Sequence, residues 1–245
     1  MVWRLFQNHF LFYWHIIRIR LLFWLIFMNL AIIILTFQIA GNPHTSVINL
    51  FFDGTSYAMV ETHHVVLPIL WFVYFFAPLL ISLNSFKQLW QARTMHLRGL
   101  QIPPRQFANV NLLLLGFITT IYCASTMTST FLASIATSRA GLSTTPGTFS
   151  ELLCLTWLGV FTLLLIQTIG NRFNPPLALI VPATILIATA YTENRFNPFS
   201  FLMLSRLPTT GTWNAILIWL GIAIAMTLGY VIIDRNIKVS LRRTS

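Results

Sequence analysis

The sequence predicts an all-α polytopic membrane protein that crosses the bilayer six times. Of its 245 residues, 56% are hydrophobic and only 8% are charged. Long apolar runs recur along the whole chain, and the charges between them separate by side. A soluble domain has about 25% charged residues, and a chain of this size cannot bury so much apolar surface against itself. We therefore take lipid as its solvent.

Six apolar runs without any charged residue are the candidate spans, since about 20 apolar residues cross the hydrocarbon core. We predict one transmembrane domain over residues 1–245, with spans at 21–40, 65–83, 110–133, 152–170, 177–191 and 213–233. The fifth run is short and rises only about 22 Å at 1.5 Å per residue. The intervening segments must then lie alternately on the two sides.

The charges support this topology and orient it. With the N-terminus in the cytoplasm, twelve of the fifteen basic residues fall inside, the exceptions being Arg139, Arg195 and Arg206. Four of the five acidic residues fall outside: Asp53, Glu61, Glu151 and Glu193. This is the positive-inside bias, and it predicts that both termini are cytoplasmic. The basic residues are dispersed between apolar runs, so we predict no nucleic-acid partner.

Residues 1–20 combine aromatic and basic side chains without Gly or Pro, including Trp3, Arg4, Trp14 and Arg18. This composition suits the headgroup layer, so we predict a helix that lies along the cytoplasmic interface before the first span. The alternative is that this segment simply extends the first span.

Two loops are predicted to carry helices. The cytoplasmic segment 84–108 begins with a helical pattern and stops at Pro103-Pro104,. The outer segment 192–212 has Asn197-Pro198 as a helix start,. Because that helix is too short to span, we predict that it is re-entrant and completes the short fifth span. Residues 234–245 form a cytoplasmic tail.

The sequence lacks the residues of common energy-coupling and catalytic sites. It has no phosphate-binding GxxxxGK[ST] loop, no HExxH motif and no charged residue within a span,. We predict no enzyme activity, no metal and no cofactor in this chain. His63-His64 is expected to be a solvated pair, and Cys123 and Cys154 are expected to be small buried hydrophobes.

Polar residues inside the spans allow two interpretations. Ser and Thr let helices approach closely, so packing is the default role. A polar translocation path is the alternative, and its candidate residues are Asn29, Thr119, Thr126, Ser129 and Thr130.

The layout resembles the permease subunit of an ABC exporter of the second exporter class. That family has six spans, cytoplasmic termini, an N-terminal elbow helix and short re-entrant helices between spans five and six. The similarity in sequence is concentrated in RTMHLRGLQIPPRQF, residues 93–107, and is weaker in NPFSFLMLSRLPTTGTW, residues 197–213. In the family, the first of these segments contains the coupling helix, which docks in a groove of the ATPase subunit.

The resemblance implies a bacterial inner-membrane protein, a second permease subunit, and a partner P-loop ATPase that binds ATP and Mg. The implied coupling residues are Arg93, Met95, His96, Leu97, Arg98, Leu100 and Pro103. A helix lying on anionic lipid is the alternative for this loop. Arg195, Phe199, Phe201 and Arg206 are candidates for an outer gate.

The cargo expected from spans without charges is amphipathic or hydrophobic, most simply a peptide that is exported or removed for self-protection. A drug or lipid exporter, or a membrane scaffold that transports nothing, is the alternative. An intramembrane enzyme would need polar catalytic groups at membrane depth, which the sequence does not place there.

Overall fold

The computed structural model describes residues 2–39, 46–63, 65–89, 104–137, 146–194, 196–207 and 212–243, and throughout these ranges the regular structure is helical. Five helices are long and apolar enough to cross a membrane, within His9–Ile39, Ile69–Leu89, Gln106–Ala136, Phe149–Phe173 and Thr212–Ile233. A sixth apolar helix, Leu177–Tyr191, is shorter. The predicted class, an all-α protein with several membrane-spanning helices, is confirmed at this level.

Helix α1 is one uninterrupted helix of 38 residues, Val2–Ile39. The sequence predicted a separate interfacial helix over residues 1–20, and the structure instead shows the alternative, in which this segment continues into the first span. The reason is local: no Gly or Pro between Val2 and Ile39 interrupts the helical hydrogen bonds,. At 1.5 Å per residue the helix is about 57 Å long, well beyond the roughly 30 Å hydrocarbon core.

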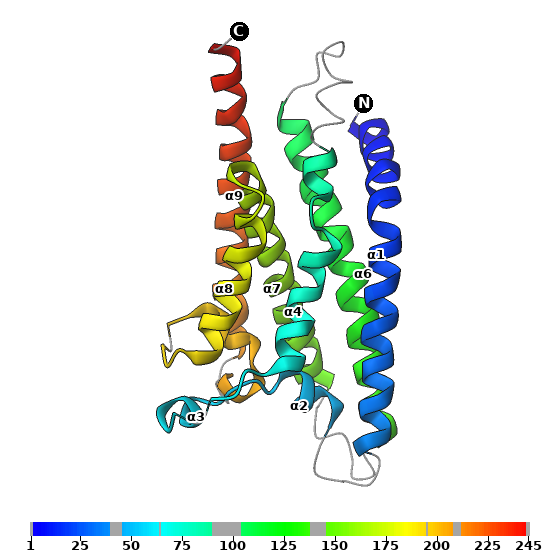
Figure 1. Ribbon diagram of the computed structural model, residues 1–245, viewed down its shortest axis with the longest axis vertical. Helices are drawn as coiled ribbons and strands as arrows, with labels where there is room; N and C mark the ends of the chain where they lie inside the picture. The colour runs from blue at the N-terminus through cyan, green and yellow to red at the C-terminus, as the bar shows by residue number, and fades with distance from the viewer. Residues whose placement is uncertain are drawn as a thin grey trace.

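Two short helices follow at the lower end of the bundle in Figure 1, α2 (Val47–Phe52) and α3 (Tyr57–Glu61). Each begins at a serine whose side chain accepts a backbone N–H, from Asn49 at Ser46 and from Met59 at Ser56. These are ordinary N-caps. Between the two helices Gly54 has φ +67°, where a side chain would be strained and would also meet Met203.

The second span is broken. Helix α4 covers Ile69–Ile81 and contains Pro78, and after a turn the chain is helical again over 85–89. Helices α6 (Pro104–Thr137) and α7 (Pro146–Phe173) then run the length of the bundle in opposite directions. In the most apolar stretch of α7, 72% of the residues are buried, whereas the share is 17% in the corresponding stretches of the first and last spans. Helix α7 therefore lies at the centre of the bundle.

Helix α8 (Leu177–Tyr191) has the bounds predicted for the fifth span. The predicted re-entrant helix after it is instead two short 3-10 helices, η1 (Pro198–Leu202) and η2 (Leu204–Arg206). Met203 between them is in an extended conformation, so no single α-helix forms. Helix α9 (Thr212–Arg243) ends the described chain.

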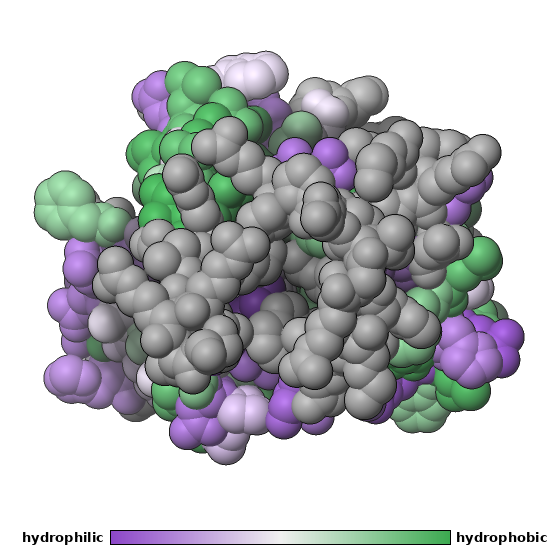
Figure 2. Space-filling model, turned by 90° about the horizontal axis from the view of Figure 1, so that it is seen from above, coloured by the Kyte–Doolittle hydropathy of each residue, from purple (hydrophilic) through white to green (hydrophobic). Residues whose placement is uncertain are grey.

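The helix directions place α1's start and α9's end at the same end of the bundle, which we call the upper end (Figure 1). The α6 start, the α7–α8 turn and the segment after α4 are also at this end. The lower end carries α2, α3, η1 and η2 (Figure 1). Seen from the upper end, the described residues at the rim are mixed, with purple hydrophilic and green hydrophobic residues side by side (Figure 2).

Candidate functional site: a lower cap and a broken span

The predicted path residues take part in helix packing within the single chain. Ser129 of α6 donates a hydrogen bond to the side-chain oxygen of Asn29 in α1, while the Asn29 amide donates to Leu25 O at 2.6 Å. Thr119, Thr126 and Thr130 are fully buried. Their hydroxyls donate to carbonyls of their own helix, Leu115 O, Tyr122 O and Met127 O, at 2.8–2.9 Å.

The most concentrated polar site lies at the lower end, around the Arg206 side chain. Arg206 follows η1 and is only 5% exposed. Its guanidinium donates five hydrogen bonds, which join the α2–α3 connection to the end of α8. The acceptors are Thr55 O (2.5 Å), Thr55 Oγ1 (2.8 Å), Thr189 O (2.8 Å), Ala190 O (3.1 Å) and Thr192 O (3.2 Å).

These partners explain how the buried charge is tolerated. Three of the carbonyls belong to the C-terminal end of α8, where unpaired C=O groups and the helix dipole favour a cation. The Tyr57 ring lies 4.9 Å from the guanidinium carbon, within cation–π range. Burial still lowers the pKa of Arg206 from its usual value, and the neighbouring Tyr57 opposes that shift. The sequence placed Arg206 on the same side as Glu151 and Glu193, but all five acceptors are uncharged.

Further contacts pack η1 and η2 against the bundle; we call η1, η2 and the 53–57 segment the lower cap. The Trp71 indole of α4 donates to Leu202 O at 3.0 Å, and Ser205 N donates to Asp53 O at 3.1 Å. A Cβ on Gly159 of α7 would lie 2.8 Å from Leu202, so this glycine permits the close approach of η1.

The predicted gate residues take different positions in this cap. Phe199 is buried and packs edge-on against Trp219 of α9, with ring centroids 4.9 Å apart. Phe201 is half-buried against the apolar core. Arg195 lies outside the described residues. The described members therefore hold the lower cap to the bundle, by packing and by hydrogen bonds from the Arg206 side chain.

The second site is the upper end of α4, where Pro78 interrupts the main-chain hydrogen bonds. A proline has no N–H, so Tyr74 O loses its usual donor four residues on. The Tyr122 hydroxyl of α6 donates to Tyr74 O instead, at 2.8 Å. The Tyr74 hydroxyl in turn pairs with Thr126 Oγ1 at 3.1 Å. All of these side chains are buried.

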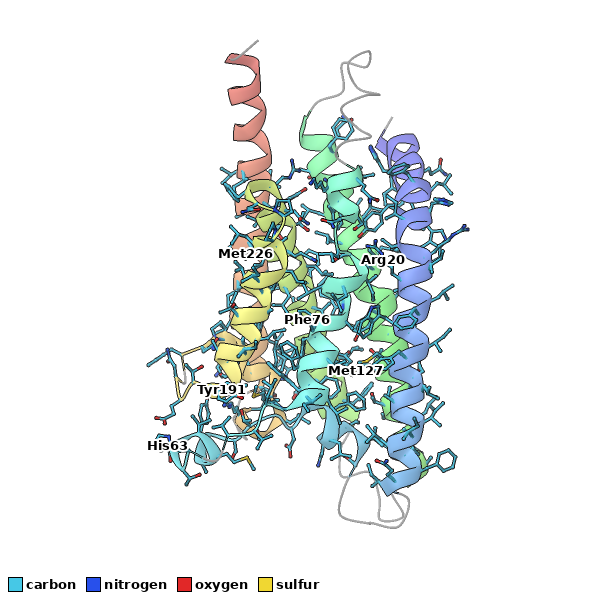
Figure 3. The ribbon with its side chains drawn as sticks, in the orientation of Figure 1. Arg20, His63, Phe76, Met127, Tyr191 and Met226 are labelled. Atoms are coloured by element: carbon cyan, nitrogen blue, oxygen red, sulfur yellow. The ribbon has the colours of Figure 1, made fainter. Side chains whose placement is uncertain are left out.

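Side chains from two other helices complete the end of α4. Gln167 of α7 donates to Leu79 O at 2.7 Å and accepts from the Ser82 hydroxyl at 2.5 Å. Arg20 of α1 donates to Leu83 O at 2.6 Å, and Figure 3 shows this arginine on the side of α1 that faces the other helices. Asn84 then has φ +60°, a left-handed conformation that asparagine accepts more readily than most residues.

The predicted coupling residues Arg93, Met95, His96, Leu97, Arg98, Leu100 and Pro103 lie outside the described residues. The broken span leads directly into their segment. Sequence reasoning did not single out Gln167, Tyr122, Arg20, Trp71 or Thr55. Gln167 alone carried a signal, since it is a side-chain amide within an otherwise apolar run,.

Among the described residues no three His, Cys, Asp or Glu side chains come together as a metal site. His63 is exposed at the lower end, as expected for a solvated residue. Cys123 is buried as predicted, whereas Cys154 is exposed because that face of α7 is not covered by another helix. Comparison of the chain with protein-family models, with curated proteins and with solved structures gives no match.

Proposed function

We propose that this chain is the permease subunit of an ATP-driven ABC exporter in a bacterial inner membrane. It would form half of a translocation pathway and pair with a second permease chain, identical or related. ATP and Mg would be bound by a separate P-loop ATPase. The resemblance in residues 93–107 suggests the class, and the arrangement of the helices supports it.

The proposed topology has six spans, with α8 as the short fifth one. Two features support it. Helix α8 turns back beside α7 and runs toward the lower cap (Figure 1), and η1 and η2 follow it in the position proposed for a re-entrant element. The upper end would be cytoplasmic, since it carries Lys87 and Arg172, whereas Asp53, Glu61 and Glu193 lie at the lower end,. The aromatic first turns of α1 would serve as the elbow, continuous with the span.

The observation that carries the proposal is the end of α4. Side chains from α1, α6 and α7 hold it in place of main-chain hydrogen bonds. A displacement of the segment beyond Leu89 would therefore act on three spans at once. An exporter needs this kind of mechanical link between a cytoplasmic loop and its membrane core.

The proposed cargo is amphipathic or hydrophobic, most simply a peptide that is exported or removed for self-protection. The outward faces of α1 and α9 are apolar, with residues such as Phe37 and Leu217 strongly exposed. Apolar molecules can reach such a surface from the lipid. The lower cap, with Phe199, Phe201 and Arg206, would be the closed outer gate.

The test is to search the genomic neighbourhood for a P-loop ATPase, to co-express it with this chain and to measure ATP turnover by the purified complex. In the double variant Leu97→Asp/Arg98→Asp we expect the permease-dependent part of the turnover to be lost, because both substitutions place negative charge on the segment proposed to dock in the groove of the ATPase subunit. Asn174→Asp, at the exposed α7–α8 turn of the same end, is the matched control and should change nothing. Unchanged turnover in the double variant would rule out the coupling role.

One observation favours a second candidate, a membrane scaffold that transports nothing. The hydroxyls of Thr119, Thr126 and Thr130 are all engaged within the chain, so they do not form an open polar path in a single copy. Vesicles containing the permease and its ATPase distinguish the two. ATP-dependent movement of a hydrophobic peptide supports the exporter, movement of a drug or lipid instead corrects only the cargo, and ATP turnover without any transport supports the scaffold.

A further inference from the structure

At the end of α4, several carbonyls accept hydrogen bonds from side chains as well as from main-chain N–H groups. Pro78 O accepts from Ser82 N and from the Ser82 hydroxyl, at 3.1 and 3.0 Å. Leu79 O accepts from Gln167, and Leu83 O accepts from Arg20. A helix that stops inside a membrane protein must have its free carbonyls satisfied in this way. These carbonyls therefore have hydrogen-bond donors although the helix does not continue.

Gln167 contacts both the last turn of α4 and the turn that follows it. Its Nε2 donates to Leu79 O, the last turn of α4, and its Oε1 accepts from Ser82, the first residue of the turn that follows. The side chain is 1% exposed and projects from α7, the most buried helix of the bundle. It therefore holds the break against the part of the molecule with the least freedom to move.

Beyond Ser82 the chain changes direction at Asn84, which is exposed and has a positive φ. The helical stretch that follows is held by the Ser85 side chain, which donates to Ser82 O at 2.6 Å. The Ser82 and Ser85 side chains are buried, whereas Asn84 between them is exposed, so the chain changes direction at a residue that its neighbours do not enclose. A few residues of this kind at an element boundary are what a hinge requires.

We propose that residues 82–84 are a hinge between α4 and the segment that enters the 90–103 loop, and that Gln167 is the positioning residue that latches it. With the latch closed, Gln167 holds Ser82, and with it the start of the segment 85–89, to α7. With the latch open, it turns about Asn84 while α4 stays packed. The hinge stands on the described contacts alone. Its use in coupling ATP hydrolysis to transport rests on the proposed function.

The matched pair of variants is Gln167→Leu and Thr168→Val. Leucine keeps the volume and removes both hydrogen bonds to the break. Thr168 is next in sequence and 3% exposed, but its hydroxyl donates only to Leu164 O of its own helix. Hydrogen–deuterium exchange of the purified chain in detergent, resolved by peptide, reports on opening. We expect exchange in peptides covering 82–89 to rise about three- to twentyfold in Gln167→Leu, since interhelical hydrogen bonds in membranes average about 0.6 kcal/mol and two are lost here.

Peptides within Ile69–Phe76 should stay unchanged in Gln167→Leu, and Thr168→Val should match the native chain throughout. Equal acceleration across α4 and α7 would mean that Gln167 only maintains packing, and no acceleration at 82–89 would mean that the break is rigid. Either result overturns the proposal.

Gln167→Glu adds a readout that packing alone does not affect. A neutral carboxyl can donate to Leu79 O and accept from Ser82, but an ionised one cannot donate. After correction for intrinsic exchange rates, 82–89 should be protected at low pH and should open as the pH rises. A pH-independent result contradicts the latch.

All of these exchange measurements are made without the ATPase. If 82–89 opens as expected while the coupling variants leave ATP turnover unchanged, the hinge stands and the exporter proposal fails. If exchange shows no hinge while turnover does respond, only the latch is wrong.

Discussion

The lower cap and the break in span two both lie where main-chain hydrogen bonds end, but they are completed in different ways. In the cap, one guanidinium supplies five hydrogen bonds to acceptors in two segments. At the break, Tyr122, Gln167 and Arg20 come from three helices and each serves one or two groups. A cap centred on one residue is either intact or lost. A break held from three sides can loosen stepwise.

The largest effect is expected for Arg206→Met, which tests whether the lower cap depends on this one residue. The substitution leaves several buried carbonyls without a donor, at about 1–3 kcal/mol for each group left unpaired. We expect the free energy of unfolding to fall by about 2–4 kcal/mol, measured by denaturant titration in detergent. Arg206→Lys should lose less, because an ammonium still offers three donors. A Met variant as stable as the native chain would show that the cap does not depend on this residue.

The fit of the cap is tested by Gly54→Ala. Alanine is strained at φ +67°, and its Cβ would lie 2.5 Å from Met203 Cγ. We expect a loss of about 1–3 kcal/mol. Met203→Ala in the same chain should remove the clash with the new Cβ. The stability loss of the double variant should therefore be smaller than the sum of the losses of the two single variants. Gly229→Ala is the control, since its Cβ would meet no atom within 4 Å. Strict additivity would contradict the close contact.

At the break the expected effects are smaller, as for Tyr122→Phe. This variant leaves Tyr74 O without its donor and should cost about 0.6–1.7 kcal/mol, the range of interhelical hydrogen bonds in membranes. In a Pro78→Ala background the restored N–H can bond to Tyr74 O, so the same Tyr122→Phe change should cost less. Equal costs in the two backgrounds, from unfolding titrations, would show that the tyrosine does not replace the missing main-chain bond.

The smallest effect concerns Asp53 in the lower cap. Burial raises the pKa of its carboxyl above the ordinary value of 3.8, so the charged form is disfavoured in the folded state. The resulting penalty is absent below that value and appears as the pH rises through the raised pKa. Asp53→Asn should therefore be slightly more stable than the native chain at pH 7 and equal to it near pH 3. Because the side chain is exposed, water screens most of this difference. If the native chain were instead more stable than Asp53→Asn at pH 7, the charged carboxylate would stabilise the folded state and the predicted direction would be wrong.

The apolar runs were enough to predict the helices that cross the bundle, and the prediction for α8 matches from Leu177 to Tyr191. The predicted bounds of elements were wrong where something other than hydropathy determines where a helix begins or ends. Nothing in residues 1–20 stops a helix, so α1 continues across the predicted boundary. The 3-10 turns of η1 and η2 depend on packing against α4, α7 and α9, which no local pattern records.

The contacts that form the two sites could not be predicted from the sequence, for a related reason. Arg206 stood out as a basic residue on the wrong side of the charge pattern, which identified the residue but not its partners. Four of the five acceptors are backbone carbonyls, including one 151 residues away, and a carbonyl has no signature in a sequence. The contact of Gln167 with Leu79 spans 88 residues in the same way.

The exposure of Cys154 has a practical consequence. It and the buried Cys123 are the only two cysteines of the chain, so one thiol is exposed, and because it lies within the fourth predicted span, a membrane-permeant reagent is the one to use. A nitroxide or a fluorescent dye can be attached there without first building a cysteine-free background. Because each copy would carry one probe at one known position, dipolar or energy-transfer spectroscopy in liposomes would report any paired state as a distance between identical sites.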